Sequence, residues 1–304
     1  MSGHLPVMLD EVLQMLAPKD GEHYVDGTFG GGGYTRAILE AADCRVLGID
    51  RDPDAIARGQ ALVKQFAGRL TLVHAPFSEL GDYLDGSTTN GVVLDLGVSS
   101  FQFDEPDRGF SFREDGPLDM RMSREGFSAA DFLNTADEFD IARVIFQLGE
   151  ERNSRRIARA IVANRPITGT ASLAQIVSDA QGPAAQRLPI HPATRTFQAL
   201  RIHVNDELGE LERGLDAAEQ ALAPHGRLVV VAFHSLEDRI VKRFLTARSA
   251  KTPNASRHAP VTRRAHPEGF RLLTNRPLAP KQSEIDLNPR ARSARLRAAE
   301  RVAA

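Results

Sequence analysis

A glycine-dense segment directly after a short apolar run constrains the fold of this chain more than any other feature. Tyr24 and Val25 lead to the carboxylate of Asp26, and the glycine run Gly30–Gly33 follows almost at once. A helix-forming stretch then begins at Thr35. Glycine permits positive φ and lets the backbone approach a ligand where a Cβ would clash. The order of strand, glycine turn and helix predicts a nucleotide-type cofactor loop at the mouth of an α/β sheet.

A second carboxylate follows the next apolar run. Val46–Ile49 predicts a buried strand, and this strand ends in Asp50. An acid at the tip of the second strand, roughly 20 residues past a glycine turn, binds ribose hydroxyls in dinucleotide-binding folds. Asp50 is therefore a candidate ribose ligand. The alternative is a solvated residue that only begins a turn.

The spacing of the glycines narrows the class of cofactor. The dinucleotide fingerprint G-x-G-x-x-G is absent, because Thr35 and Arg36 occupy the positions that its third glycine would need. The glycine-lysine phosphate loop of nucleoside triphosphatases does not follow either. A cofactor with an adenosine and a charged amino-acid tail fits better, and S-adenosylmethionine has that form.

Predicted strands and helices alternate through roughly the first hundred residues, which is typical of βαβ units and a parallel sheet. Asp52 followed by Pro53 predicts the start of one of these helices. A helical pattern at 197–218 predicts one long helix.

The alternation stops between about 101 and 192, where the pattern is helical, and the apolar run Leu228–Phe233 predicts that the sheet then resumes. We therefore expect an α/β fold with a core that is discontinuous in sequence. The core would comprise 1–103 and 191–304. An inserted helical subdomain would occupy 104–190.

The composition is that of an ordinary globular chain with a basic C-terminal third. The 304 residues are 42% hydrophobic and 26% charged, with a formal net charge of −2. Between Arg257 and Arg301 the chain has ten arginines and one lysine but only four acidic residues. This excess suggests contact with a phosphate backbone, and the alternative is a solvated tail. The single cysteine, Cys44, excludes an intrachain disulfide and a cysteine zinc site and favours the reducing cytoplasm. No apolar run approaches the ~20 residues that a membrane helix needs.

The fourth predicted strand supplies a carboxylate with a chemical task. Val92–Leu94 delivers Asp95 into a loop of small residues, and ligands of open α/β sheets lie beyond the carboxyl ends of the strands. An oxygen acceptor there can orient an exocyclic base amine and stabilise the positive charge that grows on it during methyl transfer. The alternative for Asp95 is a turn or helix-cap role. Phe77, after the third predicted strand, is a candidate to stack on an adenine or else a core residue of the next helix.

Ordered motifs along the chain resemble those of the bacterial 16S rRNA (cytosine-N4)-methyltransferase family, often called MraW. The matching runs are Asp26–Gly33, Gly48–Asp52, Leu94–Ser100, Arg108–Phe112, Gly116–Met122, Gly149–Arg152, His191–Arg201, Phe233–Lys242 and Asn288–Ser293. A match of this length and order is far more specific than a glycine turn.

The resemblance implies a Rossmann-like methyltransferase core, with the inserted helical domain at 104–190 as the candidate for RNA recognition. It also implies S-adenosylmethionine as the methyl donor and transfer to N4 of cytidine 1402 of 16S rRNA. It places the cofactor contacts on Gly32, Gly33, Tyr34, Asp50, Phe77, Asp95 and Gln102. Asp95 is also the candidate catalytic residue, and no metal is expected. The chain departs from the family at Tyr34, where histidine is usual. A backbone contact survives that change, and a contact through imidazole does not.

The residues alone leave other functions open. An amino methyltransferase that acts on DNA or another RNA would share every feature above. A nicotinamide-dependent oxidoreductase would share the sheet and the ribose acid but lacks its fingerprint, and a non-catalytic RNA-binding protein would not need three strand-end acids. His234, after the strongest strand, either faces the target base or is a satisfied turn residue. The expected partner is 16S rRNA within the small ribosomal subunit, with no membrane, for a cytoplasmic monomer or homodimer.

Overall fold

The chain forms two units, the second of which is inserted into the first. The computed structural model describes residues 6–183, 187, 190–249 and 269–303. The first unit comprises Met1–Gly97 and Leu208–Ala304, and the second comprises Val98–Glu207. The chain therefore leaves the first unit once and returns to it.

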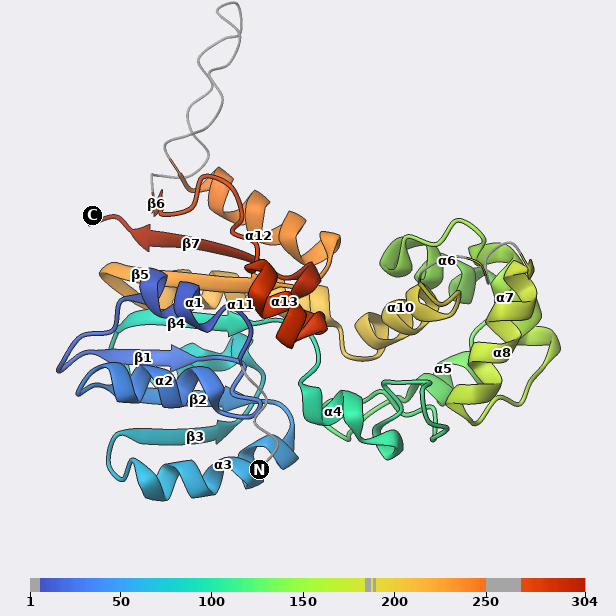
Figure 1. Ribbon diagram of the computed structural model, residues 1–304, viewed down its shortest axis with the longest axis horizontal. Coiled ribbons are helices and arrows are strands. Elements are labelled where there is room, and N and C mark those ends of the chain that lie inside the picture. The colour runs from blue at the N-terminus through green and yellow to red at the C-terminus, as the bar shows by residue number, and fades with distance from the viewer. Residues whose placement is uncertain (1–5, 184–186, 188–189, 250–268, 304) are drawn as a thin grey trace, which may run out of the picture. The chain divides into compact units, whose positions relative to one another are not determined.

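The first unit is built on a seven-stranded sheet with the order β3-β2-β1-β4-β5-β7-β6 (Figure 1). The strands are β1 (His23–Asp26), β2 (Arg45–Asp50), β3 (Leu70–His74), β4 (Thr89–Asp95), β5 (Leu222–Ala232), β6 (Phe270–Leu272) and β7 (Arg295–Arg301). Strands β1 to β5 pair in parallel, and β7 runs antiparallel to both of its neighbours. This α/β sheet confirms the predicted Rossmann-like fold class.

Helices cover both faces of this sheet. Successive strand residues point to opposite sides, and the strands carry apolar side chains on both, so each face packs against helices. Val93 and Val229 belong to one hydrophobic cluster, and Val92 and Val230 belong to another. The first cluster is completed by α1 (Leu9–Leu16), α2 (Gly33–Ala41), α3 (Pro53–Gln65) and η3 (Pro289–Ser293), near α13 (Gln282–Leu287). The second is completed by η1 (Phe77–Tyr83), α11 (Glu207–Ala221) and α12 (Ser235–Ala247). The two helical layers thus bury both faces of the sheet.

The second unit has a helical core of its own. Its described elements are α4 (Ser100–Asp104), η2 (Pro106–Arg108), α5 (Ala129–Thr135), α6 (Glu138–Gly149), α7 (Ser154–Ala163), α8 (Thr170–Gln181) and α10 (Thr194–Val204). Ile141, Ile145, Ile157 and Leu200 are fully buried in one cluster that joins α6, α7 and α10. Among the described residues of the whole chain, no helix is long and apolar enough to cross a membrane.

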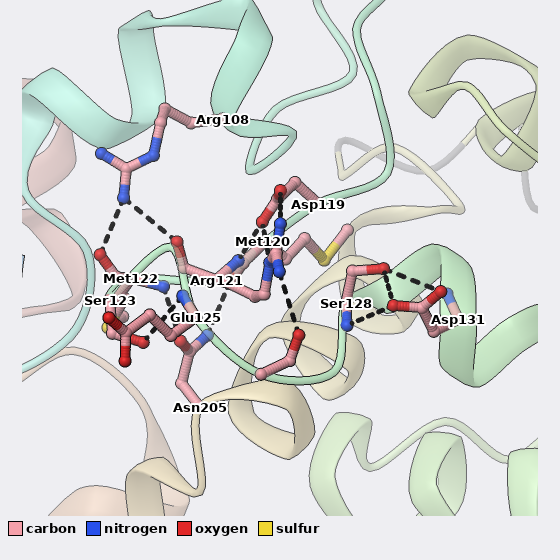
Figure 2. A network of polar contacts seen from close by, with 11 residues as sticks. Arg108, Asp119, Met120, Arg121, Met122, Ser123, Glu125, Ser128, Asp131 and Asn205 are labelled. Carbon is pink, nitrogen blue, oxygen red and sulfur yellow. Dashed lines mark hydrogen bonds and ion pairs between the residues drawn. The ribbon is translucent and has the colours of Figure 1, made fainter.

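The single helix predicted at 197–218 is wrong, because the structure divides it into α10 and α11. The break is at Asn205 and Asp206, and Asp206 has a φ of 47°. Asn205 Nδ2 donates to the carbonyl of Met120 at 2.7 Å, and its Oδ1 accepts from the amide of Met122 at 2.8 Å (Figure 2). The side chain thus bonds a distant loop where a helix would otherwise continue.

The same network fixes the loop Leu118–Met122. The Arg108 guanidinium donates to the carbonyls of Arg121 at 3.1 Å and of Met122 at 2.9 Å (Figure 2). Arg121 in turn donates to both carboxylate oxygens of Asp119, at 2.9 and 2.6 Å. This motif therefore holds the second unit together from within.

The C-terminal third contains two strands that the sequence did not predict. Arg297 on β7 donates to the carboxylate of Asp238 at 2.7 and 3.0 Å, and Arg271 on β6 donates to Glu300 at 2.8 Å. Part of the predicted phosphate-binding charge is thus neutralised within the first unit. Residues 250–268 of this basic third lie outside the described residues.

Candidate functional site

Three carboxylates lie along one edge of the sheet, at the point where the strand order reverses. β1 and β4 are neighbours, while β2 and β3 extend to one side of them and β5 to the other. Ligands of open α/β sheets bind beyond the carboxyl ends of the strands at such a switch point. β1 ends in Asp26, β2 in Asp50 and β4 in Asp95. The structure therefore brings the predicted strand-end acids to the place where a ligand would bind.

Asp26 is buried beneath the glycine turn, with 1% of its surface exposed. Its Oδ2 accepts from Thr35 Oγ1 at 2.7 Å, and its Oδ1 accepts from the amide of Thr28 at 3.3 Å. Burial raises the pKa of Asp26 to about 6, against the effect of these donors. Asp26 therefore joins the start of α2 to the end of β1 and fixes the shape of the turn between them.

Asp50 ties the second strand to the same turn. The amide of Gly30 donates to Asp50 Oδ2 at 2.7 Å, and the amide of Asp52 donates to Oδ1 at 2.8 Å. Burial raises the pKa of Asp50 to about 6, although both amide donors favour the ionised form. The side chain is only partly buried, and a carboxylate has about four lone-pair sites. Asp50 can accept hydrogen bonds from a ribose as well as from the backbone.

Asp95 has a buried acceptor with no donor. Its amide donates to Thr28 Oγ1 at 2.6 Å, which fixes the end of β4. Its Oδ1 is buried and accepts no hydrogen bond from any residue that the structure describes. Burial, followed by the nearby charges of Asp26 and Glu237, raises the pKa of Asp95 well above its ordinary value. An unsatisfied buried polar atom costs about 1–3 kcal/mol, so this oxygen suits a ligand that brings an N–H or a positive charge.

The last two glycines of the turn are required by the chain's own packing. Gly32 has a φ of +74°, and a Cβ there would lie 2.8 Å from Cζ of Phe29. A Cβ on Gly33 would lie 2.3 Å from Cγ of Pro6. Side chains of the protein therefore occupy the space that the missing Cβ atoms leave. A backbone contact from Gly32 and Gly33 to a cofactor stays a prediction.

Tyr34 points into the core of the first unit. Its side chain is 4% exposed, and its hydroxyl donates to the carbonyl of Val7. Burial also raises the pKa of the Tyr34 phenol. The residue that departs from the family pattern thus joins the N-terminal segment to α2. A contact between the backbone of Tyr34 and a cofactor stays a prediction.

Phe77 packs against α11. A Cβ on Gly214 would lie 2.1 Å from Phe77 Cε2, so the ring lies directly on the backbone of this helix. The next residue, Ser78, donates from both its amide and its Oγ to the carboxylate of Glu210, at 2.9 Å each. The loop after β3 is therefore held by α11. The core role weighed for Phe77 is present in the structure, and stacking on an adenine stays a prediction.

Gln102 belongs to the second unit and caps a helix there. Its amide donates to Ser99 Oγ at 3.2 Å, and its Oε1 accepts from the amide of Ser99 at 3.0 Å. This capping box begins α4. A contact from Gln102 to the cofactor stays a prediction.

Two further residues lie at this edge of the sheet: His234, for which the sequence left a base contact or a turn role open, and Glu237, which was not assigned from the sequence. His234, two residues after the end of β5, is the N-cap of α12, and Glu237 completes its capping box. Glu237 Oε2 accepts from the amides of Phe233 at 2.7 Å and His234 at 3.2 Å. The signal that could have identified them is the spacing of a capping box, in which Glu237 follows His234 by three residues just after the strongest predicted strand.

A model of the MraW methylase family matches residues 1–302. The chain belongs to the MraW methylase family. The resemblance in the sequence motifs is thereby confirmed, and with it the prediction of an S-adenosylmethionine-dependent methyltransferase. A role of the carboxylates at the sheet edge in the activity of this family member stays a prediction.

Relatives from two bacteria match almost the whole chain. Both are named "Ribosomal RNA small subunit methyltransferase H". The protein of Xanthobacter autotrophicus is 62% identical over 307 residues, covering 98% of this chain and 87% of the relative. The protein of Parvibaculum lavamentivorans is 57% identical over 312 residues, covering 100% of this chain and 91% of the relative. Among solved structures, a putative methyltransferase from Streptococcus mutans in complex with SAH is 10% identical, with a TM-score of 0.46 and coverage of 98% and 99%. That TM-score is too low to bear on function.

Proposed function

We propose that this MraW family member transfers a methyl group from S-adenosylmethionine to N4 of a cytidine in 16S rRNA. The names of the two relatives support small-subunit rRNA as the substrate. The structural observation that carries the proposal is the buried Asp95 Oδ1, which has no donor among the described residues. It lies at the switch point of the sheet, where a bound amine would supply that donor. The cytoplasm, where small subunits assemble, is the compartment that this function requires.

The residues at the sheet edge fit S-adenosylmethionine. Asp50 would accept from the ribose hydroxyls, and the backbone of Gly32–Tyr34 would contact the cofactor from the glycine turn. Burial disfavours the ionised forms of Asp26 and Asp95, and a positive charge nearby favours them again. This pair of carboxylates is therefore suited to a cationic ligand. When bound, S-adenosylmethionine supplies a methyl group whose bond to sulfur breaks as its bond to N4 forms.

Asp95 would position the amine that receives this methyl group. The lone pair of a cytosine amine is conjugated into the ring, so N4 is a weak nucleophile until it is oriented and its growing charge is stabilised. Asp95 Oδ1 would accept one N4–H, which aligns the amine and favours the positive charge on it. The other N4 proton would pass to water after transfer, which leaves N4-methylcytosine and S-adenosylhomocysteine as the products. The rate enhancement would come mainly from proximity and orientation.

We assign RNA recognition to the second unit, as predicted for 104–190. Phe139 and Phe146 are 73% and 58% exposed, and they lie with Arg143 on one face of α6 at helical spacing. Aromatic rings and guanidinium groups stack on the bases of single-stranded RNA and pair with its phosphates. The exposed arginines of α7 are Arg155, Arg156 and Arg159. The two helices thus offer both kinds of contact that an unpaired rRNA segment needs.

Methyl transfer to a panel of nucleic acids tests this proposal. The substrates are small subunits from cells that lack the modification, protein-free 16S rRNA and DNA oligonucleotides, each with S-adenosylmethionine. We expect N4-methylcytosine at one position of the rRNA, located by mass spectrometry of nuclease fragments. Transfer only to DNA, or a methyl group on another atom of the rRNA, would contradict the proposal.

A further inference from the structure

A second buried polar atom near Asp95 also makes no hydrogen bond. His234 Nε2 has no hydrogen-bond partner among the described residues, and the His234 side chain is 9% exposed. It lies 3.1 Å from Glu237 Oε1, without the alignment that a hydrogen bond requires. Only one of the two ring nitrogens of His234 therefore makes a hydrogen bond within the turn.

The other nitrogen of this imidazole fixes where its proton is. His234 Nδ1 accepts from the amide of Glu237 at 3.4 Å, which caps α12. An imidazole nitrogen that accepts an N–H carries no proton itself, so in the neutral ring the proton is on Nε2. His234 Nε2, which makes no hydrogen bond although Glu237 is near it, is thus a donor, whereas Asp95 Oδ1 is an acceptor without a donor.

The two atoms come from adjacent strand ends within the first unit. Asp95 is in register with Val231 of β5, and the amide of Leu96 donates to the carbonyl of Val231 at 2.9 Å. His234 follows three residues later. Its partner Glu237 is close enough to Asp95 for its charge to act on that carboxylate. The acceptor and the donor therefore lie at the same edge of the same pair of strands.

We infer that Asp95 Oδ1 and His234 Nε2 together recognise the Watson–Crick edge of the target base. This inference rests on the proposed function. Cytosine presents an N4–H donor beside the N3 acceptor, so Oδ1 would accept from N4 and Nε2 would donate to N3. Uracil presents the reverse, a carbonyl at position 4 beside N3–H. Its O4 would then face the acceptor Asp95 Oδ1, and its N3–H would face the donor His234 Nε2. His234 is thus a specificity-determining residue that contacts the base, in addition to its role as the cap of α12.

Two substitutions of His234 separate its two roles. His234→Asn keeps an oxygen that can cap α12, but its short side chain does not reach the position of Nε2. His234→Gln gives up the cap and places an amide N–H near the position of Nε2. The measurements are the methyl-transfer rate on small subunits at saturating S-adenosylmethionine, the affinity for S-adenosylmethionine by calorimetry, and the melting temperature.

We expect His234→Asn to keep the wild-type melting temperature and cofactor affinity while its methyl-transfer rate falls by at least about tenfold, the loss that one transition-state hydrogen bond causes. His234→Gln should melt at a lower temperature and retain more of the rate than His234→Asn does.

A His234→Asn variant as active as the wild type would overturn the inference, and so would a loss that only follows weaker cofactor binding. A His234→Gln variant that restores no activity at a temperature where it is folded would refute donation from Nε2. An inactive wild-type enzyme would contradict the proposed function itself, so the two failures are distinguishable.

Discussion

Replacing Asp26 by asparagine should change how the stability of the fold depends on pH. Asp26 is 1% exposed, and burial raises its pKa from 3.8 to about 6. Because the folded state binds this proton more tightly than the unfolded chain does, Asp26 opposes folding above about pH 6, and stability is regained as the pH falls toward 3.8. Between pH 7.5 and pH 5, this one group should add about 1.4 kcal/mol to the free energy of unfolding.

Urea denaturation at the two pH values measures this contribution directly. The free energy of unfolding of the wild type should rise on acidification by about 1.4 kcal/mol more than that of Asp26→Asn. The asparagine also loses one of the hydrogen bonds from Thr28 and Thr35, which costs about 1–3 kcal/mol at either pH and cancels from the comparison. Glu40→Gln, an exposed change on the same helix as Thr35, is the matched control and should follow the wild type. If wild type and Asp26→Asn show the same pH dependence, the assignment of a buried carboxylate with a raised pKa is refuted.

Three other substitutions test the site and its supports. Asp50→Asn should weaken S-adenosylmethionine binding by about 10–100-fold in calorimetry, because hydrogen bonds to an ionised acceptor are lost, and an unchanged affinity would remove Asp50 from the site. Gly214→Ala places a Cβ 2.1 Å from the Phe77 ring. Overpacking against this ring should lower the free energy of unfolding by about 1–3 kcal/mol, which exceeds the gain of about 1 kcal/mol from replacing glycine by alanine in a helix. Urea denaturation should therefore show a net loss of stability, whereas Gly81→Ala, with open space around it, should be neutral. Tyr34→Phe should cost about 1 kcal/mol of stability and leave cofactor affinity unchanged, and a tenfold weaker affinity would show that the hydroxyl acts on the cofactor.

The sequence predicted best those features whose causes are close together along the chain. Asp52 does cap α3, accepting from the amide of Asp54 at 3.0 Å, and Pro53 is its first residue. The carboxylates of the site follow the same logic, since an acid that ends an apolar run is carried to the edge of a parallel sheet wherever the strands pair. The sheet edge could therefore be located without coordinates.

Features that depend on distant partners could not be predicted. The end of α10 requires Met120, which is 85 residues from Asn205. β7 alternates Leu296 and Ala298, which are buried, with arginines. The arginines alone suggested contact with a phosphate backbone, or else a solvated tail. Their acidic partners, such as Asp238 for Arg297, are identified only once the strand lies in the sheet. The glycine turn is a mixed case, because its conformation was predicted but its packing against Pro6 and Phe29 was not.

The most direct test of the account is the methylation state of 16S rRNA after reaction with the wild type and with Asp95→Ala. Small subunits that lack the modification are incubated with each protein and S-adenosylmethionine, and the rRNA is analysed by mass spectrometry. Melting curves establish in parallel that the variant is folded, and calorimetry measures its cofactor affinity so that both proteins are compared at saturating S-adenosylmethionine. The account predicts one N4-methylcytosine with the wild type and none with Asp95→Ala. Methylation of that cytosine by Asp95→Ala at the wild-type rate would contradict the central claim that this buried carboxylate holds the amine.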